Sequence, residues 1–130
     1  TRYSARIFTH LYRMVRNREE AEDLAQETFI RAYRHLRSYD AARPFRNWLY
    51  AIATNVGLNA IRARQRRERA AEAIPGPPDP APPAGPSDAA ERLAEAIKRL
   101  PPQSAVLIHL HYHEGMRIRE AAEIAGMSET

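Results

Sequence analysis

These 130 residues are enough for one ordinary domain or two very small ones, so a single large catalytic domain is excluded. The formal net charge is +4, but residues 1–69 hold 15 basic and 7 acidic side chains whereas residues 70–130 hold 5 and 9, so the front half is the candidate binder of a polyanion. The chain has no cysteine, which excludes disulfides, thiolate zinc sites and cysteine nucleophiles.

Apolar residues recur at helical intervals in the front half, which predicts an all-helical module. The first helix is expected over residues 2–15 and the second over residues 18–36, with acidic side chains near its start and arginines near its end. A loop is expected over residues 38–44, and a third helix from Pro44 to about Arg69. The residues expected to face inward on the first helix are Ile7, Leu11, Met14 and Val15.

A proline-rich stretch marks the predicted domain boundary. Residues 74–86 hold seven of the ten prolines, which is typical of a semi-extended spacer that tethers its neighbours without docking them rigidly. Further helices are expected over residues 87–100, 101–115 and 118–125. The predicted fold class is all-α, with two small helical domains (residues 1–73 and 87–130) joined by this linker.

The third helix carries a polar stripe on the flank of its apolar face. Helical winding brings together Asn55, Asn59, Arg62 and Arg66. Amides that read bases beside arginines that hold phosphates would explain the stripe, and a solvated face that ends in a basic tail would explain it equally well. The basic run alone could also bind RNA or an anionic membrane.

The second helix has an outer stripe of Asp23, Glu27, Ile30 and Arg34, with Gln26 at its edge. An isoleucine inside a charged face suggests a protein contact, although a scattered surface apolar residue is the commoner explanation. The residues expected on the opposite, buried face are Ala21, Ala25, Phe29, Ala32 and Leu36.

Two stretches resemble known sequences. AEDLAQETFIRAYRHLRSYD (residues 21–40) followed by RPFRNWLYAIATNVGLNAIRARQRR (residues 43–67) closely resembles region 2 of extracytoplasmic-function sigma factors, a family of bacterial transcription initiation factors. LPPQSAVLIHLHYHEGMRIREAAEIAGMS (residues 100–128) is similar to the start of region 4 of the same family.

The resemblance implies two functional surfaces. The family's contact with the coiled coil of the largest subunit of core RNA polymerase maps onto Asp23, Gln26 and Glu27, and Ile30 shares their stripe. Reading of the promoter's minus-10 element, preferentially on the non-template strand, maps onto the third helix and onto the preceding loop, which forms a pocket for an extruded base. The residues expected to bind DNA are Ser38, Tyr39, Asp40, Arg43, Trp48, Asn55, Asn59, Arg62 and Arg66.

Some residues limit what the resemblance implies. Trp48 or Tyr50 could stack on an unpaired base, but for Trp48 a core position beside Phe45 is at least as well supported. The recognition helix expected after Glu129 is absent from this sequence, so these residues are not expected to read a minus-35 element. His109 and His113 stand one helical turn apart and could hold a metal ion, but no third ligand obviously completes the site, so a helix rim is favoured.

No catalytic constellation emerges, so neither enzymatic activity nor a cofactor or metal is expected. The resemblance implies a protein that binds core RNA polymerase and promoter DNA and is held by an anti-sigma factor. A cytoplasmic protein without membrane insertion is expected, because no signal peptide is visible and the charge-free stretch at residues 47–61 is too short and too polar to span a bilayer. A stand-alone helix-turn-helix DNA-binding regulator is the main alternative, and a helical module that docks on membrane or RNA is another. The alternatives differ in whether DNA binding needs polymerase and whether one DNA strand is preferred.

Overall fold

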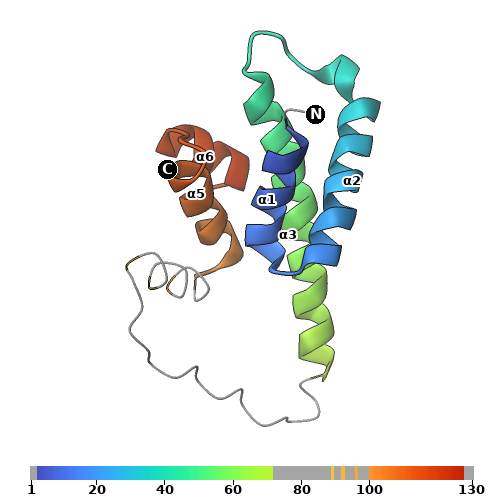
Figure 1. Ribbon diagram of the computed structural model, residues 1–130, viewed down its shortest axis with the longest axis vertical. Coiled ribbons are helices and arrows are strands. Elements are labelled where there is room, and N and C mark those ends of the chain that lie inside the picture. Colours follow the sequence, from blue (N-terminus) through green and yellow to red (C-terminus); the bar gives the residue numbers. More distant parts are fainter. Residues whose placement is uncertain (1–2, 72–88, 90–91, 93–95, 97–99, 128–130) are drawn as a thin grey trace.

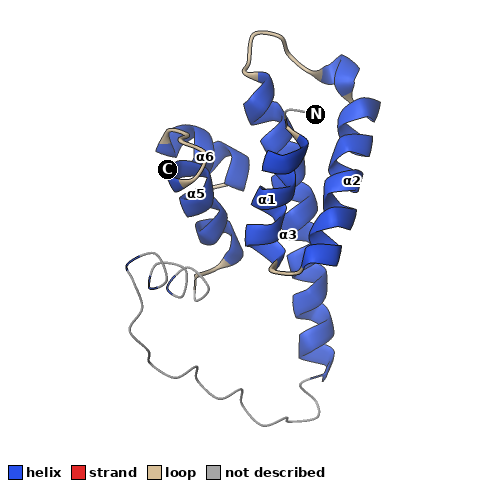
Figure 2. Ribbon diagram, viewed as in Figure 1, coloured by secondary structure: helices blue, strands red, loops and turns tan. Residues whose placement is uncertain are grey.

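The described part of the chain is helical. The computed structural model describes residues 3–71, 89, 92, 96 and 100–127, and every regular element in the described segments is a helix (Figures 1 and 2). The elements are α1 (Ser4–Val15), α2 (Arg18–Arg34), the 3-10 turn η1 (Leu36–Ser38), α3 (Phe45–Ala71), α5 (Pro102–Tyr112) and α6 (Ile118–Ala125). The all-α class is therefore confirmed. The proline-rich stretch lies outside the described residues, as does the helix expected over residues 87–100 except at residues 89, 92, 96 and 100.

A two-residue connection joins α1 to α2. Arg16 adopts the left-handed conformation (φ 58°), and its N–H donates to the carbonyl of Tyr12 over 2.8 Å, which ends α1. The side chain of Asn17 then accepts a hydrogen bond from the N–H of Glu20 over 2.8 Å and caps the start of α2. Because the connection is so short, the two helices run antiparallel (Figure 1).

Helices α1, α2 and α3 form a bundle around a shared apolar core. Ile7 and Leu11 of α1 and Leu49 of α3 are almost completely buried in it. Gly57 of α3 allows α1 to approach closely, since a Cβ atom there would lie 2.6 Å from the terminal methyl of Met14. An ion pair between Arg64 and Glu20 ties α3 to the start of α2.

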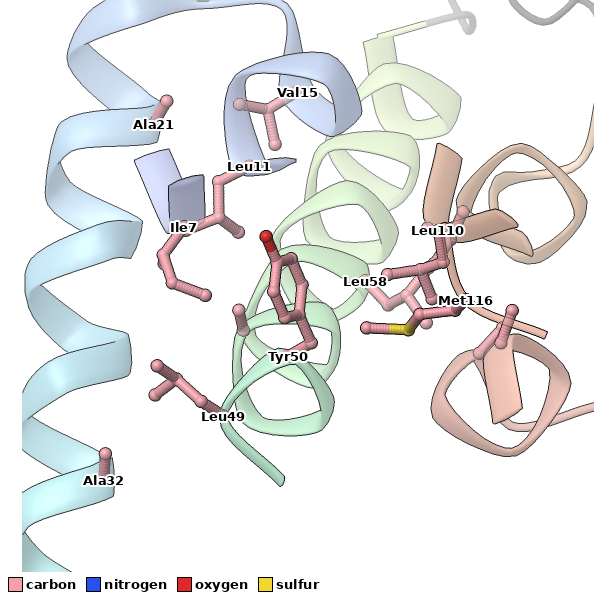
Figure 3. Close-up of a cluster of buried hydrophobic side chains, with 14 residues drawn as sticks. Ile7, Leu11, Val15, Ala21, Ala32, Leu49, Tyr50, Leu58, Leu110 and Met116 are labelled. Atoms are coloured by element: carbon pink, nitrogen blue, oxygen red, sulfur yellow. The ribbon is translucent and has the colours of Figure 1, made fainter. Parts of the chain in front are cut away.

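Helices α5 and α6 pack on α1 and α3, on the side of these helices away from α2 (Figure 1). Leu58 of α3 lies beside Leu110 of α5 and Met116 of the turn between α5 and α6 (Figure 3). Leu110 and Met116, which belong to the rear segment (residues 100–127), are at most 1% exposed. The rear residues thus share the hydrophobic cluster of the front bundle. The expectation that the front and rear segments are tethered without firm docking is corrected by this shared core.

Three side chains differ from expectation. Leu36 was expected to be buried but is 51% exposed, because α2 ends at Arg34 and the chain turns into η1. His109 was expected on a helix rim but is buried against α1. Tyr50 is completely buried, so it is not available for stacking on a base. In the described part of the chain, no helix is long and apolar enough to span a membrane.

Candidate nucleic-acid interface

The polar stripe of α3 is present on the folded surface. Asn55, Asn59, Arg62 and Arg66 are all exposed. The side-chain oxygen of Asn59 accepts a hydrogen bond from Arg62 over 3.4 Å, so these two side chains already contact each other. At 1.5 Å per residue, the stripe runs about 16 Å along the helix. An extended row of amides and guanidiniums suits a strand better than a compact ligand.

The loop before α3 has a defined shape. The hydroxyl of Tyr39 donates to the carbonyl of Arg43 over 2.6 Å, and the carboxylate of Asp40 accepts from the N–H of Ala42 over 3.0 Å. The hydroxyl of Ser38 donates to the carbonyl of His35 over 2.7 Å. These bonds between side chain and backbone organise the loop before any ligand arrives. The Asp40 and Arg43 side chains remain exposed.

Trp48 belongs to an aromatic cluster at the start of α3. Its ring centroid lies 5.2 Å from that of Tyr39 and 5.5 Å from that of Phe45, and Tyr39 also meets Phe45 edge to face at 5.4 Å. Trp48 is half-buried. The core position beside Phe45 is therefore present, and part of the indole still borders solvent.

Trp48 also lines a groove between α2 and α3 that has a volume of about 340 Å³. It is lined by Arg31, His35, Trp48, Ala51, Ile52 and Asn55. The groove joins the aromatic cluster to the first residue of the α3 stripe, so a flat ring with polar edges would meet apolar walls, an amide and a guanidinium. Sequence analysis missed Arg31 and His35 as members of this surface. The i, i+4 spacing of Arg31 in the last turn of α2 and His35 directly after it was the available signal.

The outer face of α2 presents the residues expected to bind polymerase. Asp23 and Gln26 are exposed, and Ile30 is 47% exposed among them. Glu27 is half-buried, and its carboxylate accepts a 2.8 Å hydrogen bond from Arg31, which also lines the groove. The α2 face and the groove therefore meet at the Glu27–Arg31 pair.

Two histidines at the end of α5 lie close together. The ring centroids of His109 and His113 are 5.5 Å apart. Burial, the charge of His113 and the charges of Arg13 and Arg16 lower the pKa of His109 to about 4. Among the described residues, no group of three or more His, Cys, Asp or Glu side chains could hold a metal ion.

Comparisons with known proteins agree on one family. The sigma-70 region 2 model matches residues 1–67. The chain is similar to the ECF RNA polymerase sigma factor SigW of Bacillus subtilis, with 49% identity over 63 residues that cover 48% of this chain and 34% of SigW. It is also similar to the RNA polymerase sigma factor CarQ of Myxococcus xanthus, with 32% identity over 129 residues that cover 98% of this chain and 74% of CarQ. The match spans about a third of the length of SigW and 24% of SigE from Mycolicibacterium smegmatis.

Two solved structures share the fold. One is the sigma factor RpoE in complex with the anti-sigma factor NepR from Bartonella quintana, with a TM-score of 0.72 and 21% identity over 96% of this chain and 79% of RpoE. The other is CnrH in complex with the cytosolic domain of CnrY, with a TM-score of 0.64 and 26% identity over 98% of this chain and 70% of CnrH. Both likenesses extend over almost the whole chain, including α5 and α6.

Proposed function

Because the chain belongs to the sigma-70 region 2 family, we propose that it acts as an RNA polymerase sigma factor of the extracytoplasmic-function type. In this role it binds core RNA polymerase and directs recognition and opening of the promoter's minus-10 element. The observation that carries the proposal is the family match over residues 1–67, a range that contains both the outer face of α2 and the whole α3 stripe.

The proposed polymerase contact is the outer face of α2, made of Asp23, Gln26, Glu27 and Ile30. Its support is the combination of exposed acidic and amide groups with one exposed apolar side chain, which is the composition of a protein contact rather than of a nucleic-acid contact. The partner is the coiled coil of the largest polymerase subunit.

The proposed DNA contact is the loop from Ser38 to Arg43, the edge of Trp48 and the α3 stripe. Its support is continuity, because the groove between α2 and α3 contains both Trp48 and Asn55 and so links the loop end of α3 to the stripe. We assign base reading to Asn55 and Asn59 and phosphate contacts to Arg62 and Arg66. The preferred ligand is the melted non-template strand.

Fluorescence anisotropy with matched single-stranded and duplex minus-10 probes, each with and without core polymerase, tests the proposal. A sigma factor should bind the single strand better than the duplex, and polymerase should greatly strengthen binding. Tight duplex binding that polymerase does not change would instead identify a stand-alone helix-turn-helix regulator.

The polymerase contact has its own test. The double variant Asp23→Ala with Glu27→Ala should weaken co-elution with core polymerase while it shifts stability by about 0.5 kcal/mol or less, because both side chains border solvent. The double variant Glu68→Ala with Glu123→Ala removes the same charge from exposed positions elsewhere and should leave co-elution intact. If both double variants bind core polymerase as tightly as the unchanged protein does, the proposed polymerase contact is wrong.

Further partners and boundaries follow from the same proposal. In the two solved structures, RpoE is bound to the anti-sigma factor NepR and CnrH is bound to the cytosolic domain of CnrY. We propose that this chain also binds an anti-sigma factor. We retain residues 1–73 and 87–130 as the region 2 and region 4 modules, with residues 74–86 as the linker. The role is that of an initiation factor without catalysis of its own, acting in the cytoplasm beside the polymerase.

A further inference from the structure

A polar cavity of about 380 Å³ lies between α1, the start of α3 and the turn that follows α5. It is lined by Arg6, Thr9, Arg13, Arg46, His113 and Glu114. Arg6 and Arg13 come from one side of α1, Arg46 comes from the first turn of α3, and Glu114 comes from the rear segment. The three arginines therefore belong to the bundle, and residues of the rear segment close the cavity beside them.

Glu114 is the single carboxylate among the described residues that line this cavity, and three arginines line the cavity with it. Its side chain is only 11% exposed, and its Oε1 lies 3.5 Å from Nη1 of Arg13. Arg46 donates from Nη1 to the backbone carbonyl of Glu114 over 3.4 Å. One carboxylate cannot neutralise three guanidiniums, so the cavity keeps an excess of positive charge.

A second contact holds the rear segment to the same end of α3. Asn47, which follows Arg46, donates from Nδ2 to the carboxylate of Glu120 on α6 over 2.6 Å. The start of α3, next to the loop at residues 38–44, is thus bonded to the rear segment twice, by Arg46 to a backbone carbonyl and by Asn47 to a carboxylate. This arrangement matches the opposite net charges of the two halves of the sequence.

We propose that Arg6, Arg13 and Arg46 form a phosphate-binding site that Glu114 fills from within the chain, so that the α5–α6 hairpin and a phosphate group compete for it. Guanidiniums bind phosphate oxygens in the same geometry as carboxylate oxygens, and a phosphate offers more acceptors to three donors than one carboxylate does. The phosphate comes from a nucleic-acid backbone or from free phosphate ion. Competition with DNA rests on the proposed function, but the site uses none of the α3 stripe residues.

The first test compares two variants that lose the same charge from the rear segment. Glu114→Gln empties the site of its carboxylate, whereas Glu123→Gln changes an exposed position on α6 outside the cavity. With a scrambled single-stranded oligonucleotide as the probe, Glu114→Gln should tighten binding by about tenfold, the size of one charge-assisted hydrogen bond, and steepen the log–log salt slope by about 0.7. Glu123→Gln should have a much smaller effect, and adding Arg13→Gln to Glu114→Gln should remove the gain.

Equal effects of Glu114→Gln and Glu123→Gln would overturn the proposal, because general electrostatics would then explain the gain. Circular dichroism checks that both variants keep their helix content. Adding Arg66→Ala should weaken binding of the probe by the same factor in every variant. The ratio of the affinities of Glu114→Gln and the unchanged protein should therefore persist. If the unchanged protein shows no polymerase-dependent promoter binding, the proposed function is contradicted. The ratio of affinities between Glu114→Gln and the unchanged protein would still test the phosphate-binding site.

The second test uses the unchanged site and identifies the source of the phosphate. Since the chain lacks cysteine, Tyr33→Cys and Tyr112→Cys provide two exposed labelling positions, on α2 and α5, for fluorescence energy transfer. Transfer should fall as the oligonucleotide displaces the hairpin, and a methylphosphonate oligonucleotide without backbone charge should have no effect. A fall with inorganic phosphate, compared with chloride at equal ionic strength, identifies free phosphate as a ligand. Constant transfer with both phosphate sources would overturn the proposal.

Discussion

Asn55 and Arg66 lie on one exposed stripe of α3 but offer different chemistry to a nucleic acid. An amide can distinguish base edges, whereas a guanidinium at the far end of the stripe meets the repeating phosphate charge. Removing each of the two side chains should therefore change nucleic-acid binding in a different way.

Asn55→Ala should cost about 1 to 3 kcal/mol on the preferred minus-10 strand and much less on scrambled DNA, so discrimination falls. Arg66→Ala should weaken all sequences alike and flatten the log–log salt slope by about 0.7 for a single strand. Anisotropy titrations at several salt concentrations, with polymerase present, measure both effects. A loss of affinity that is independent of sequence for Asn55→Ala would contradict its assignment to base reading.

Single side chains were predictable where helical winding alone decides their exposure. The four stripe residues of α3 are exposed as expected, and Ile7, Leu11 and Val15 are buried as expected. The predicted burial of Leu36 and the predicted rim position of His109 were wrong for opposite reasons. A helix that ends early exposes the first, and a neighbouring helix far away in sequence covers the second.

At the scale of helices, α1 approaches α3 closely at Gly57. A Cβ atom there would lie 2.6 Å from Cε of Met14 and 3.2 Å from Cδ2 of Leu11. Gly57→Val should therefore lower stability by about 1 to 3 kcal/mol through overpacking, despite the poor helix propensity of glycine. Chemical denaturation measures the loss.

Met14→Ala in the same chain is the matched control, because it removes the atoms nearest to the new side chain. The double variant should be more stable than the sum of the two single losses predicts, which a double-mutant cycle reveals. Strict additivity of the two losses would show that Met14 does not set the close approach.

Helix positions were mostly predictable because their signals are local. Asn17 caps α2, proline at the start of α5 fits its first turn, and α6 spans residues 118–125 as expected. The end of α2 was placed two residues too late. Its last turn carries no glycine or proline to mark the end, and the transition to η1 depends on how the loop packs around Tyr39.

At the scale of the whole molecule, two buried histidines lie where the rear segment meets the bundle. His10 of α1 is fully buried beside Tyr50 and Thr54 of α3, with Nε2 3.0 Å from the Thr54 hydroxyl, and His109 of α5 is near it. Burial, the charge of His109 and the charge of Arg13 lower the pKa of His10 to about 3. Folding therefore holds both histidines neutral.

The melting temperature should consequently fall as the pH drops. The unfolded chain protonates these histidines near pH 6.5, whereas in the folded chain the pKa values are about 3 for His10 and about 4 for His109. Their contribution to stability is complete above pH 6.5 and is lost progressively below it, at up to about 1.4 kcal/mol per pH unit for each group. Thermal melts from pH 7.5 to pH 4.5 measure this dependence.

His109→Gln should flatten that dependence, because it removes one of the histidines whose pKa is lowered by burial. His35→Gln, at an exposed position after α2, is the control and should leave the slope unchanged. A slope for His109→Gln as steep as that of the unchanged chain would show that acid destabilisation comes from other groups.

The docking of the rear segment was not predictable from the sequence. The contacts that hold it join residues 68 and 73 positions apart, such as Arg46 with Glu114 and Asn47 with Glu120, and no local pattern encodes such pairs. The uneven charge of the two halves was visible, but it indicated a polyanion as the partner of the basic half. In the folded chain, carboxylates of the rear segment meet part of that basic surface.

The α1–α3 layer separates the outer face of α2 from the α5–α6 hairpin (Figure 1). The outer face of α2 and the cavity beside the hairpin share no side chain. Free-energy changes from substitutions on the two sides should add, as they do for distant independent sites. Polymerase seated on α2 would then leave the hairpin population unchanged, and the nucleic acid would supply the free energy that releases it. The three components then need no fixed order of assembly, and docking on polymerase can precede opening of the hairpin.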